Sequence, residues 1–106
     1  MEIEDKKYIV IISERASEML VSHARFLAQV SEQAAQNFIE EFKVSAKSLE
    51  NLPERNPRLD VPAMPINKYR RMLIYKRYLL IYQIKGNIVY VDYIVDCRQD
   101  YEWLLQ

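Results

Sequence analysis

All four prolines of this 106-residue chain fall between residues 53 and 67, and this clustering limits the possible folds more than any other feature of the sequence. Proline lacks a backbone N–H and fixes φ, so neither a helix nor an inner strand runs through such a stretch. Helical periodicity dominates before the prolines, whereas Tyr, Ile, Val and Leu dominate after them. We therefore expect a helical part, an extended surface connection over 53–67, and a β-rich part.

The part before the prolines predicts one strand and two helices. The segment 7–12 is rich in β-branched residues and predicts a short strand. Ser13 is placed to cap a first helix, and Ser31 a second one after almost no linker. Apolar residues then follow helical spacing. They are Ala16, Met19, Leu20, Phe26, Leu27 and Val30 in the first helix, and Ala35, Phe38, Phe42, Leu49 and Leu52 in the second, which Pro53 should end.

The part after the prolines predicts a three-stranded meander. The strands read YRRMLIY, YLLIYQI and NIVYVDYIVD, and the breaks between them are Lys76-Arg77 and Lys85-Gly86-Asn87. Gly86 is the only glycine, and with Asn87 it supplies the positive φ angles of a tight hairpin. The break at Lys76-Arg77 contains no such residue. In the last strand, the alternation predicts that one set of residues faces the helices: Val89, Val91, Tyr93 and Val95.

The predicted order is strand, two helices and three strands, which indicates a single α+β domain over 1–106. The first strand should lie beside the later sheet, and both helices should cover one face. The sequence DYEWLLQ, from residue 100 on, predicts a short terminal helix or tail.

The single cysteine, the short apolar run near the start and the distribution of charge limit where the protein can act and what it can bind. A lone Cys97 cannot form an intramolecular disulfide, and the apolar run near the start is too short for a signal peptide or a membrane span, so we expect a cytoplasmic protein without membrane contact. The net charge is zero, yet residues 66–91 hold six Lys or Arg and no Asp or Glu. Such a basic segment is typical of phosphate contact, although basic residues on an edge strand also discourage aggregation.

Several short patterns, in this order, resemble the RelE/ParE superfamily of bacterial toxins. A helical hairpin ends in Leu49, Leu52 and Pro53, and a Tyr-Arg pair at Tyr69-Arg70 opens the next strand. They are followed by a Tyr-x-x-x-Tyr strand with Tyr78 and Tyr82, and by an Asp-x-Arg-x-Asp-Tyr step with Asp96, Arg98, Asp100 and Tyr101. The resemblance covers nearly the whole chain and implies a toxin of a type II toxin-antitoxin system, with a cognate antitoxin as its partner.

Members of this superfamily divide into ribosome-dependent messenger-RNA endonucleases and proteins that poison DNA gyrase. For a nuclease, the resemblance implies Arg70, Arg98 and Tyr101 as catalytic residues, because arginine stabilises charge on phosphorus without titrating. Supporting RNA phosphate contacts would come from the remaining basic residues of the strand region, namely Lys68, Arg71, Lys76 and Arg77. No metal or cofactor is expected.

Each of these roles has a structural alternative. Arg70 could form an ion pair with Asp92 or Asp96, and Tyr101 could pack with the terminal segment. His23 is expected to be a hydrogen-bonded residue at the core boundary, and Cys97 a small buried residue at a strand end. The sequence also departs from the nuclease pattern, because the hairpin ends in SLENLPERN without a lysine cluster and no histidine follows His23.

Three hypotheses follow. The first is a RelE-like endoribonuclease that cleaves messenger RNA in the ribosome and loses activity on Arg98→Ala. The second is a ParE-like inhibitor of DNA gyrase without nuclease activity. The third is an attenuated homologue that only binds an antitoxin.

Overall fold

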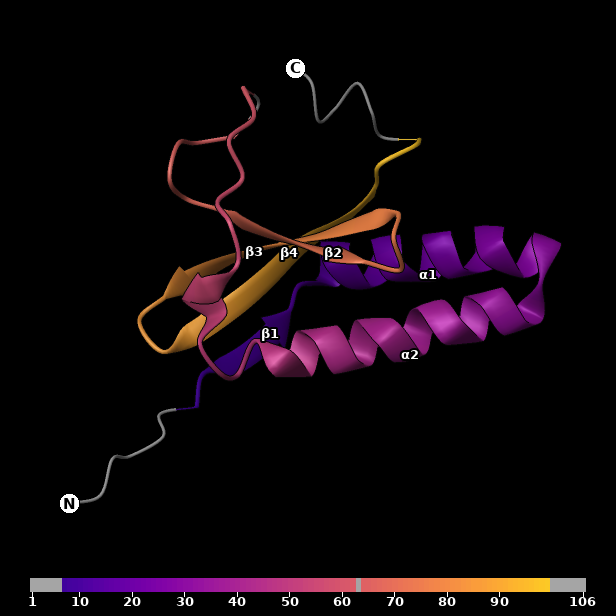
Figure 1. Ribbon diagram of the computed structural model, residues 1–106, viewed down its shortest axis with the longest axis horizontal. Coiled ribbons are helices and arrows are strands. Elements are labelled where there is room, and N and C mark those ends of the chain that lie inside the picture. Colours follow the sequence, from indigo (N-terminus) through magenta and orange to yellow (C-terminus); the bar gives the residue numbers. More distant parts are fainter. Residues whose placement is uncertain (1–6, 63, 100–106) are drawn as a thin grey trace.

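Four strands form one sheet, and two helices lie along one of its faces (Figure 1). The computed structural model describes residues 7–62 and 64–99, so the predicted terminal segment from residue 100 on lies outside the described residues. The elements are β1 (Ile9–Ile12), α1 (Glu14–Val30), α2 (Glu32–Ser48), the 3-10 helix η1 (Pro53–Arg55), β2 (Arg70–Ile74), β3 (Tyr78–Lys85) and β4 (Ile88–Asp96).

Serine caps set the boundaries of the helical hairpin, as predicted. The Ser13 hydroxyl oxygen accepts the Ala16 N–H at 3.0 Å, and the Ser31 hydroxyl oxygen accepts the Ala34 N–H at 3.1 Å. The Ser31 N–H also donates to the Leu27 carbonyl, so one serine ends α1 and begins α2. Each cap satisfies a backbone donor that has no partner inside its helix.

The second helix ends earlier than predicted. It stops at Ser48, and Leu52 takes a left-handed conformation with φ of 49° before Pro53 opens η1. Leu49 is fully buried, as its place in the pattern predicts, but Leu52 is 69% exposed. The prediction that Leu52 lies on the helical core face is therefore wrong, because the chain has already left the helix at that point.

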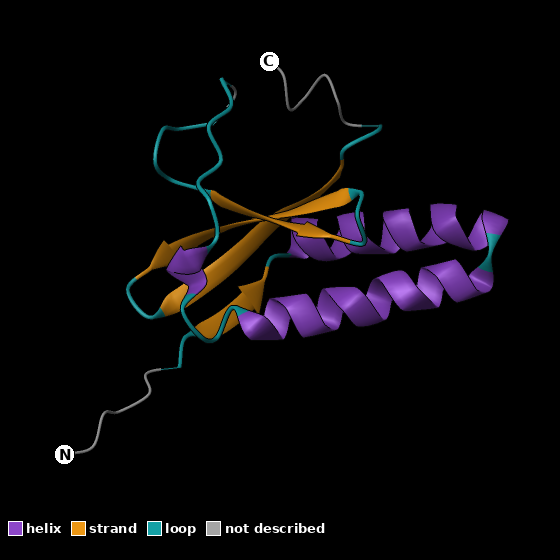
Figure 2. Cartoon of the chain, in the orientation of Figure 1, coloured by secondary structure: helices purple, strands orange, loops and turns teal. Residues whose placement is uncertain are grey.

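The sheet order is β1-β4-β3-β2, and Figure 2 draws the strands in orange. β1 runs parallel to β4, with Ile9 opposite Ile88, and the other two pairs are antiparallel. The predicted position of the first strand beside the later sheet is confirmed, and so is the α+β arrangement. Among the described residues, no helix has the length and apolar character needed to cross a membrane.

The main core lies between the helices and the sheet. Phe38 and Leu49 from the helical part meet Tyr78, Tyr82 and other sheet residues there, and all four are fully buried. Tyr78 packs against Phe38 with ring centroids 4.6 Å apart. The tyrosines of the Tyr-x-x-x-Tyr pattern thus belong to the helix-facing side of β3.

A β-bulge changes which residues of β4 face the helices. Tyr82 pairs with Val91 but Ile81 pairs with Tyr93, so Asp92 is an extra residue in β4. Val89 and Val91 belong to the main core, as predicted. The prediction fails for Tyr93 and Val95, which pack on the opposite face, because an extra residue reverses the side on which all later side chains emerge.

The proline-rich connection covers part of that opposite face. Leu59 is 3% exposed and packs with Tyr69, Ile81 and Val95 in a second, smaller core. Arg58 forms a single antiparallel bridge with Arg70, so this connection also extends the sheet beyond β2. It is therefore more than the surface crossing that the sequence predicted.

The two hairpin turns differ in strain. Gly86 has φ of 60°, as predicted, whereas Asn87 does not have a positive φ. In the β2–β3 turn, Tyr75 and Lys76 have φ of 51° and 55°, and the Arg77 N–H donates to the Ile74 carbonyl. Two consecutive positive φ angles are the backbone pattern of a type I′ turn. The Glu41 carboxylate of α2 accepts the Tyr75 N–H and so binds this turn to the helical hairpin.

Candidate functional site

The two described residues of the predicted catalytic set lie at different ends of the sheet. Arg70 begins β2 opposite Tyr82, while Arg98 follows β4 just after Asp96, which is opposite Tyr78. Tyr78 and Tyr82 are four residues apart on β3, a rise of about 13 Å. The structure does not bring the two arginines together in this arrangement. Tyr101 lies outside the described residues, so its predicted role remains a prediction.

Arg70 holds the loop that follows the helical hairpin. Its Nη1 donates to the carbonyl oxygens of Glu54 at 2.9 Å and Asn56 at 2.6 Å. Its β-sheet partner Tyr82 donates its hydroxyl to the Pro53 carbonyl and accepts the Asn56 side-chain amide at 3.0 Å. The Tyr-Arg and Tyr-x-x-x-Tyr patterns therefore meet at one loop.

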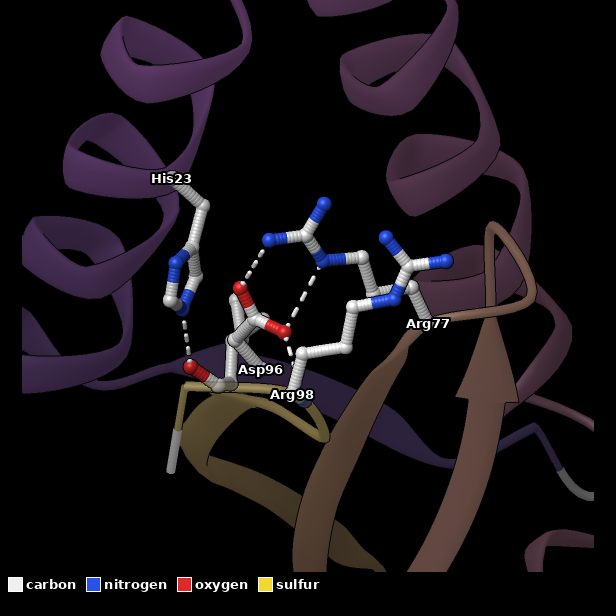
Figure 3. Close-up of polar contacts among 5 residues, drawn as sticks. His23, Arg77, Asp96 and Arg98 are labelled. Carbon is white, nitrogen blue, oxygen red and sulfur yellow. Dashed lines mark hydrogen bonds and ion pairs between the residues drawn. The ribbon is translucent and has the colours of Figure 1, made fainter. Parts of the chain in front are cut away.

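Asp96 is not a partner of Arg70, as the structural alternative supposed, but of Arg77. The Arg77 Nε donates to Asp96 Oδ1 at 2.9 Å and Nη2 donates to Oδ2 at 2.7 Å (Figure 3). The Arg98 backbone N–H donates to the same carboxylate at 2.8 Å. Asp92, the other proposed partner, accepts the side-chain amide of Gln83.

The Arg77–Asp96 pair is buried and electrostatically coupled. Asp96 is fully buried and the Arg77 side chain is 17% exposed. Burial alone would raise the pKa of Asp96, but the hydrogen bonds from Arg77 and from the Arg98 backbone hold that pKa below its usual value. The hydrogen bond to Asp96 likewise raises the pKa of Arg77. The guanidinium also lies 5.4 Å from the Tyr78 ring centroid, so its position is fixed by packing.

The other predicted phosphate contacts are dispersed, and three of them, Lys68, Arg71 and Lys76, are exposed. Lys68 and Arg71 lie near the start of β2, where Lys68 Nζ is 5.3 Å from the Tyr69 ring centroid. Lys76 lies in the strained turn at the other end of the β2–β3 hairpin, next to Arg77. Of the four, only Arg77 has its guanidinium committed to a buried carboxylate, and the RNA-binding role of the whole set stays a prediction.

The structure adds Arg58, which the sequence did not single out, to the basic residues at Arg70. A cavity of about 210 Å³ opens at this point. Its lining consists of Glu54, Arg58, Asn67, Lys68, Arg70 and Ile84. Pairing between the proline-rich connection and β2 brings Arg58 here, and only its charge within the segment PERNPRLD could have suggested a role.

His23 and Cys97 have the structural positions expected of them. His23 is half-buried, and its Nε2 lies 2.7 Å from the Ile94 carbonyl oxygen (Figure 3). Its ring packs against Phe38 and Tyr78. Cys97 is half-buried just after β4, and its backbone N–H donates to the Arg77 carbonyl. Within residues 7–62 and 64–99, no three His, Cys, Asp or Glu side chains gather in a way that could hold a metal ion.

Comparison with known proteins shows which family the sequence matches. Residues 10–101 match the family model described as the ParE toxin of the type II toxin-antitoxin system parDE. A solved structure titled as a chromosomal ParDE toxin-antitoxin system from P. aeruginosa aligns with 86% of this chain and 97% of that chain, with a TM-score of 0.69 and 11% identity. At that identity the structural match shows the shared fold. No curated protein matches the sequence.

Proposed function

Because this chain belongs to the ParE toxin family of type II toxin-antitoxin systems, we propose that it inhibits DNA gyrase and that a cognate antitoxin neutralises it. The observation that carries this proposal is the family match, which runs from β1 to the segment after β4. Among superfamily members, gyrase inhibition is the activity that the resemblance associates with the ParE branch. The RelE-like reading, messenger-RNA cleavage in the ribosome, has less support and is not the function proposed.

The arrangement of charged residues also favours binding over catalysis. RNA cleavage through the 2′-hydroxyl needs a proton acceptor and cations that converge on one phosphate. Arg70 and Arg98 are separated along the sheet, and Arg77 is paired with Asp96. The only histidine, His23, contacts a backbone carbonyl on the helix-facing side. A protein that inhibits by binding its target needs none of these groups to meet.

The proposed antitoxin would cover apolar side chains that the described chain leaves exposed. Both edge strands carry them: Ile9 is 54% exposed and Ile11 is 41% exposed on β1, and Leu73 is 60% exposed on β2. Edge strands also present backbone N–H and C=O groups that a partner segment can pair with. An antitoxin segment that pairs with an edge strand would cover the exposed apolar side chains and form hydrogen bonds with these backbone groups.

The experiment that tests the function is controlled expression in a bacterial host with pulse labelling of DNA replication and translation. Purified protein is assayed in parallel for inhibition of supercoiling by gyrase and for cleavage of messenger RNA on ribosomes. We expect replication to fall first, supercoiling to be inhibited and messenger RNA to stay intact.

Two variants sharpen the result. Arg98→Ala removes an exposed cation that a nuclease would need, and Lys43→Ala removes an exposed cation from α2 as a matched control. An early fall in translation that only Arg98→Ala relieves would contradict the proposal and indicate a ribonuclease. Absence of any growth effect, with antitoxin binding retained, would indicate an attenuated homologue.

A further inference from the structure

Arg58 and Arg70 face each other across the bridge that joins the proline-rich connection to β2. The Arg71 N–H donates to the Pro57 carbonyl at 3.0 Å, and the Leu59 N–H donates to the Tyr69 carbonyl at 2.9 Å. These bonds flank the pair and do not join its two members. In antiparallel pairing this is the closer type of residue pair, with Cα atoms about 4.5 Å apart and side chains on the same face.

Two like charges directly opposite one another in a sheet destabilise it. Lys68 adds a third cation to the same cavity, whose only acidic lining residue is Glu54. The Glu54 carboxylate already accepts the Tyr8 hydroxyl at 2.9 Å. Within the described part of the chain, the ion pairs join other residues, so Arg58, Lys68 and Arg70 have no carboxylate within 4.0 Å.

Contacts within the chain hold two of the three cationic side chains of the cavity, Arg70 and Lys68, in place. Arg70 Nη1 is fixed by two backbone carbonyls, and this leaves the other donors of the guanidinium for a further partner. Lys68 Nζ lies over the Tyr69 ring, whose side chain is itself buried. An oxyanion between the two arginines would replace their repulsion with charge-assisted hydrogen bonds, which the planar guanidinium makes in pairs.

We propose that this cavity is a binding site for a phosphate group, with Arg58 and Arg70 as opposed clamps and Lys68 as the third cation. Its volume of about 210 Å³ leaves room for a tetrahedral oxyanion. Three cations match a phosphate better than a single protein carboxylate, and the surrounding segment 66–91 contains no acidic residue. The phosphate could be free or belong to a nucleic-acid backbone, and the site does not depend on gyrase being the target.

The first test measures the thermal unfolding midpoint of the full chain in sodium phosphate and in sodium chloride at equal ionic strength. The test variant is Arg58→Gln, because the Arg58 side chain is exposed and is not needed to hold the loop. The matched control is Arg55→Gln, which removes an exposed arginine from the same segment outside the cavity lining.

We expect phosphate to raise the midpoint of the wild type and of Arg55→Gln but not of Arg58→Gln. In chloride, Arg58→Gln should be at least as stable as the wild type, since it removes the repulsion. An equal response to phosphate in all three proteins would overturn the proposal. So would an equal effect of acetate at the same ionic strength, because that would indicate a carboxylate site.

The second test identifies the source of the phosphate by fluorescence anisotropy with a short DNA duplex. If the source is nucleic acid, Arg58→Gln should weaken binding about tenfold, the effect of losing a hydrogen bond to a charged group. It should also reduce the salt dependence by about one phosphate contact, and Arg55→Gln should do neither. Unchanged DNA affinity together with a lost phosphate response would assign the site to a free phosphate. Equal weakening by both variants, without a phosphate response, would show general charge attraction and sink the proposal.

Discussion

Arg70 and Tyr82 are direct partners across β2 and β3, and both bind the carbonyl oxygens of the same loop. Arg70 takes the carbonyls of Glu54 and Asn56, and Tyr82 takes that of Pro53. The loop turns the chain out of the helical hairpin and toward the sheet. Two side chains on one rung of the sheet therefore fix the junction between the two halves of the fold.

Removing one of these contacts should loosen the loop and weaken the other. We expect Tyr82→Phe to lower the free energy of unfolding by about 1–2 kcal/mol, because the Pro53 carbonyl and the Asn56 amide each lose a hydrogen-bond partner. Arg70→Met should have a similar effect. In urea unfolding, the loss of free energy in the double variant should be smaller than the sum of the two single losses by about 0.5–1 kcal/mol. Strict additivity would show that the two contacts act independently, and Tyr90→Phe on β4 is the control.

The Arg77–Asp96 pair should contribute strongly to stability. We expect Asp96→Asn to lower the free energy of unfolding by about 3 kcal/mol, because it leaves the mostly buried Arg77 guanidinium without its opposite charge. Glu40→Gln breaks the surface pair with Lys43, whose side chains are 71% and 66% exposed, and should change the urea midpoint little. Equal effects of the two substitutions would show that the buried pair has no special role.

Asp96 should also make the protein sensitive to acid. Its pKa is lower in the folded protein than the ordinary value of 3.8, so the folded state favours the ionised carboxylate. That stabilisation is present above pH 3.8 and is lost as the pH falls toward and through the lowered pKa. The free energy of unfolding measured between pH 6 and pH 2 should fall less steeply in Asp96→Asn. Parallel curves for the two proteins would contradict this assignment.

The β2–β3 turn offers a stabilising substitution. Lys76 is exposed and has φ of 55°, a conformation that costs a non-glycine residue about 1 kcal/mol. Lys76→Gly should therefore raise the free energy of unfolding by up to about 1 kcal/mol, less the greater flexibility of glycine in the unfolded chain. Lys76→Ala removes the same charge but keeps the Cβ atom, so it should not stabilise. A gain in both variants would trace the effect to charge instead of backbone strain.

The features that were predicted correctly depend on neighbouring residues. Ser13 and Ser31 cap helices through atoms three residues away, and Gly86 sets its own turn. The helices and strands themselves follow from local periodicity, although Val30 and Leu52 are exposed where the pattern predicts a helical core face. The causes of these features lie within short segments of the sequence.

The features that were missed depend on pairing between distant segments. The alternation of β4 continues through Asp92 without a break, so the bulge follows only from its register with β3. The pairing of Arg77 with Asp96 has no sign in the sequence either, because the two residues are 19 positions apart and their approach depends on the same register. The position of Arg58 cannot be predicted from the sequence, because the proline-rich connection has no periodicity to show that it joins the sheet.

The parallel pairing of β1 with β4 also affects how the chain is made. Ile9 pairs with Ile88, which is synthesised 79 residues later, and a ribosome needs roughly 4–16 s to add that many residues. During this time the first strand has no partner, and α1 lacks the part of the sheet that β4 supplies. A nascent chain of this toxin is therefore exposed to chaperones and proteases until its last strand emerges. The cell thus has an interval, set by translation speed, in which to degrade the protein before it is complete.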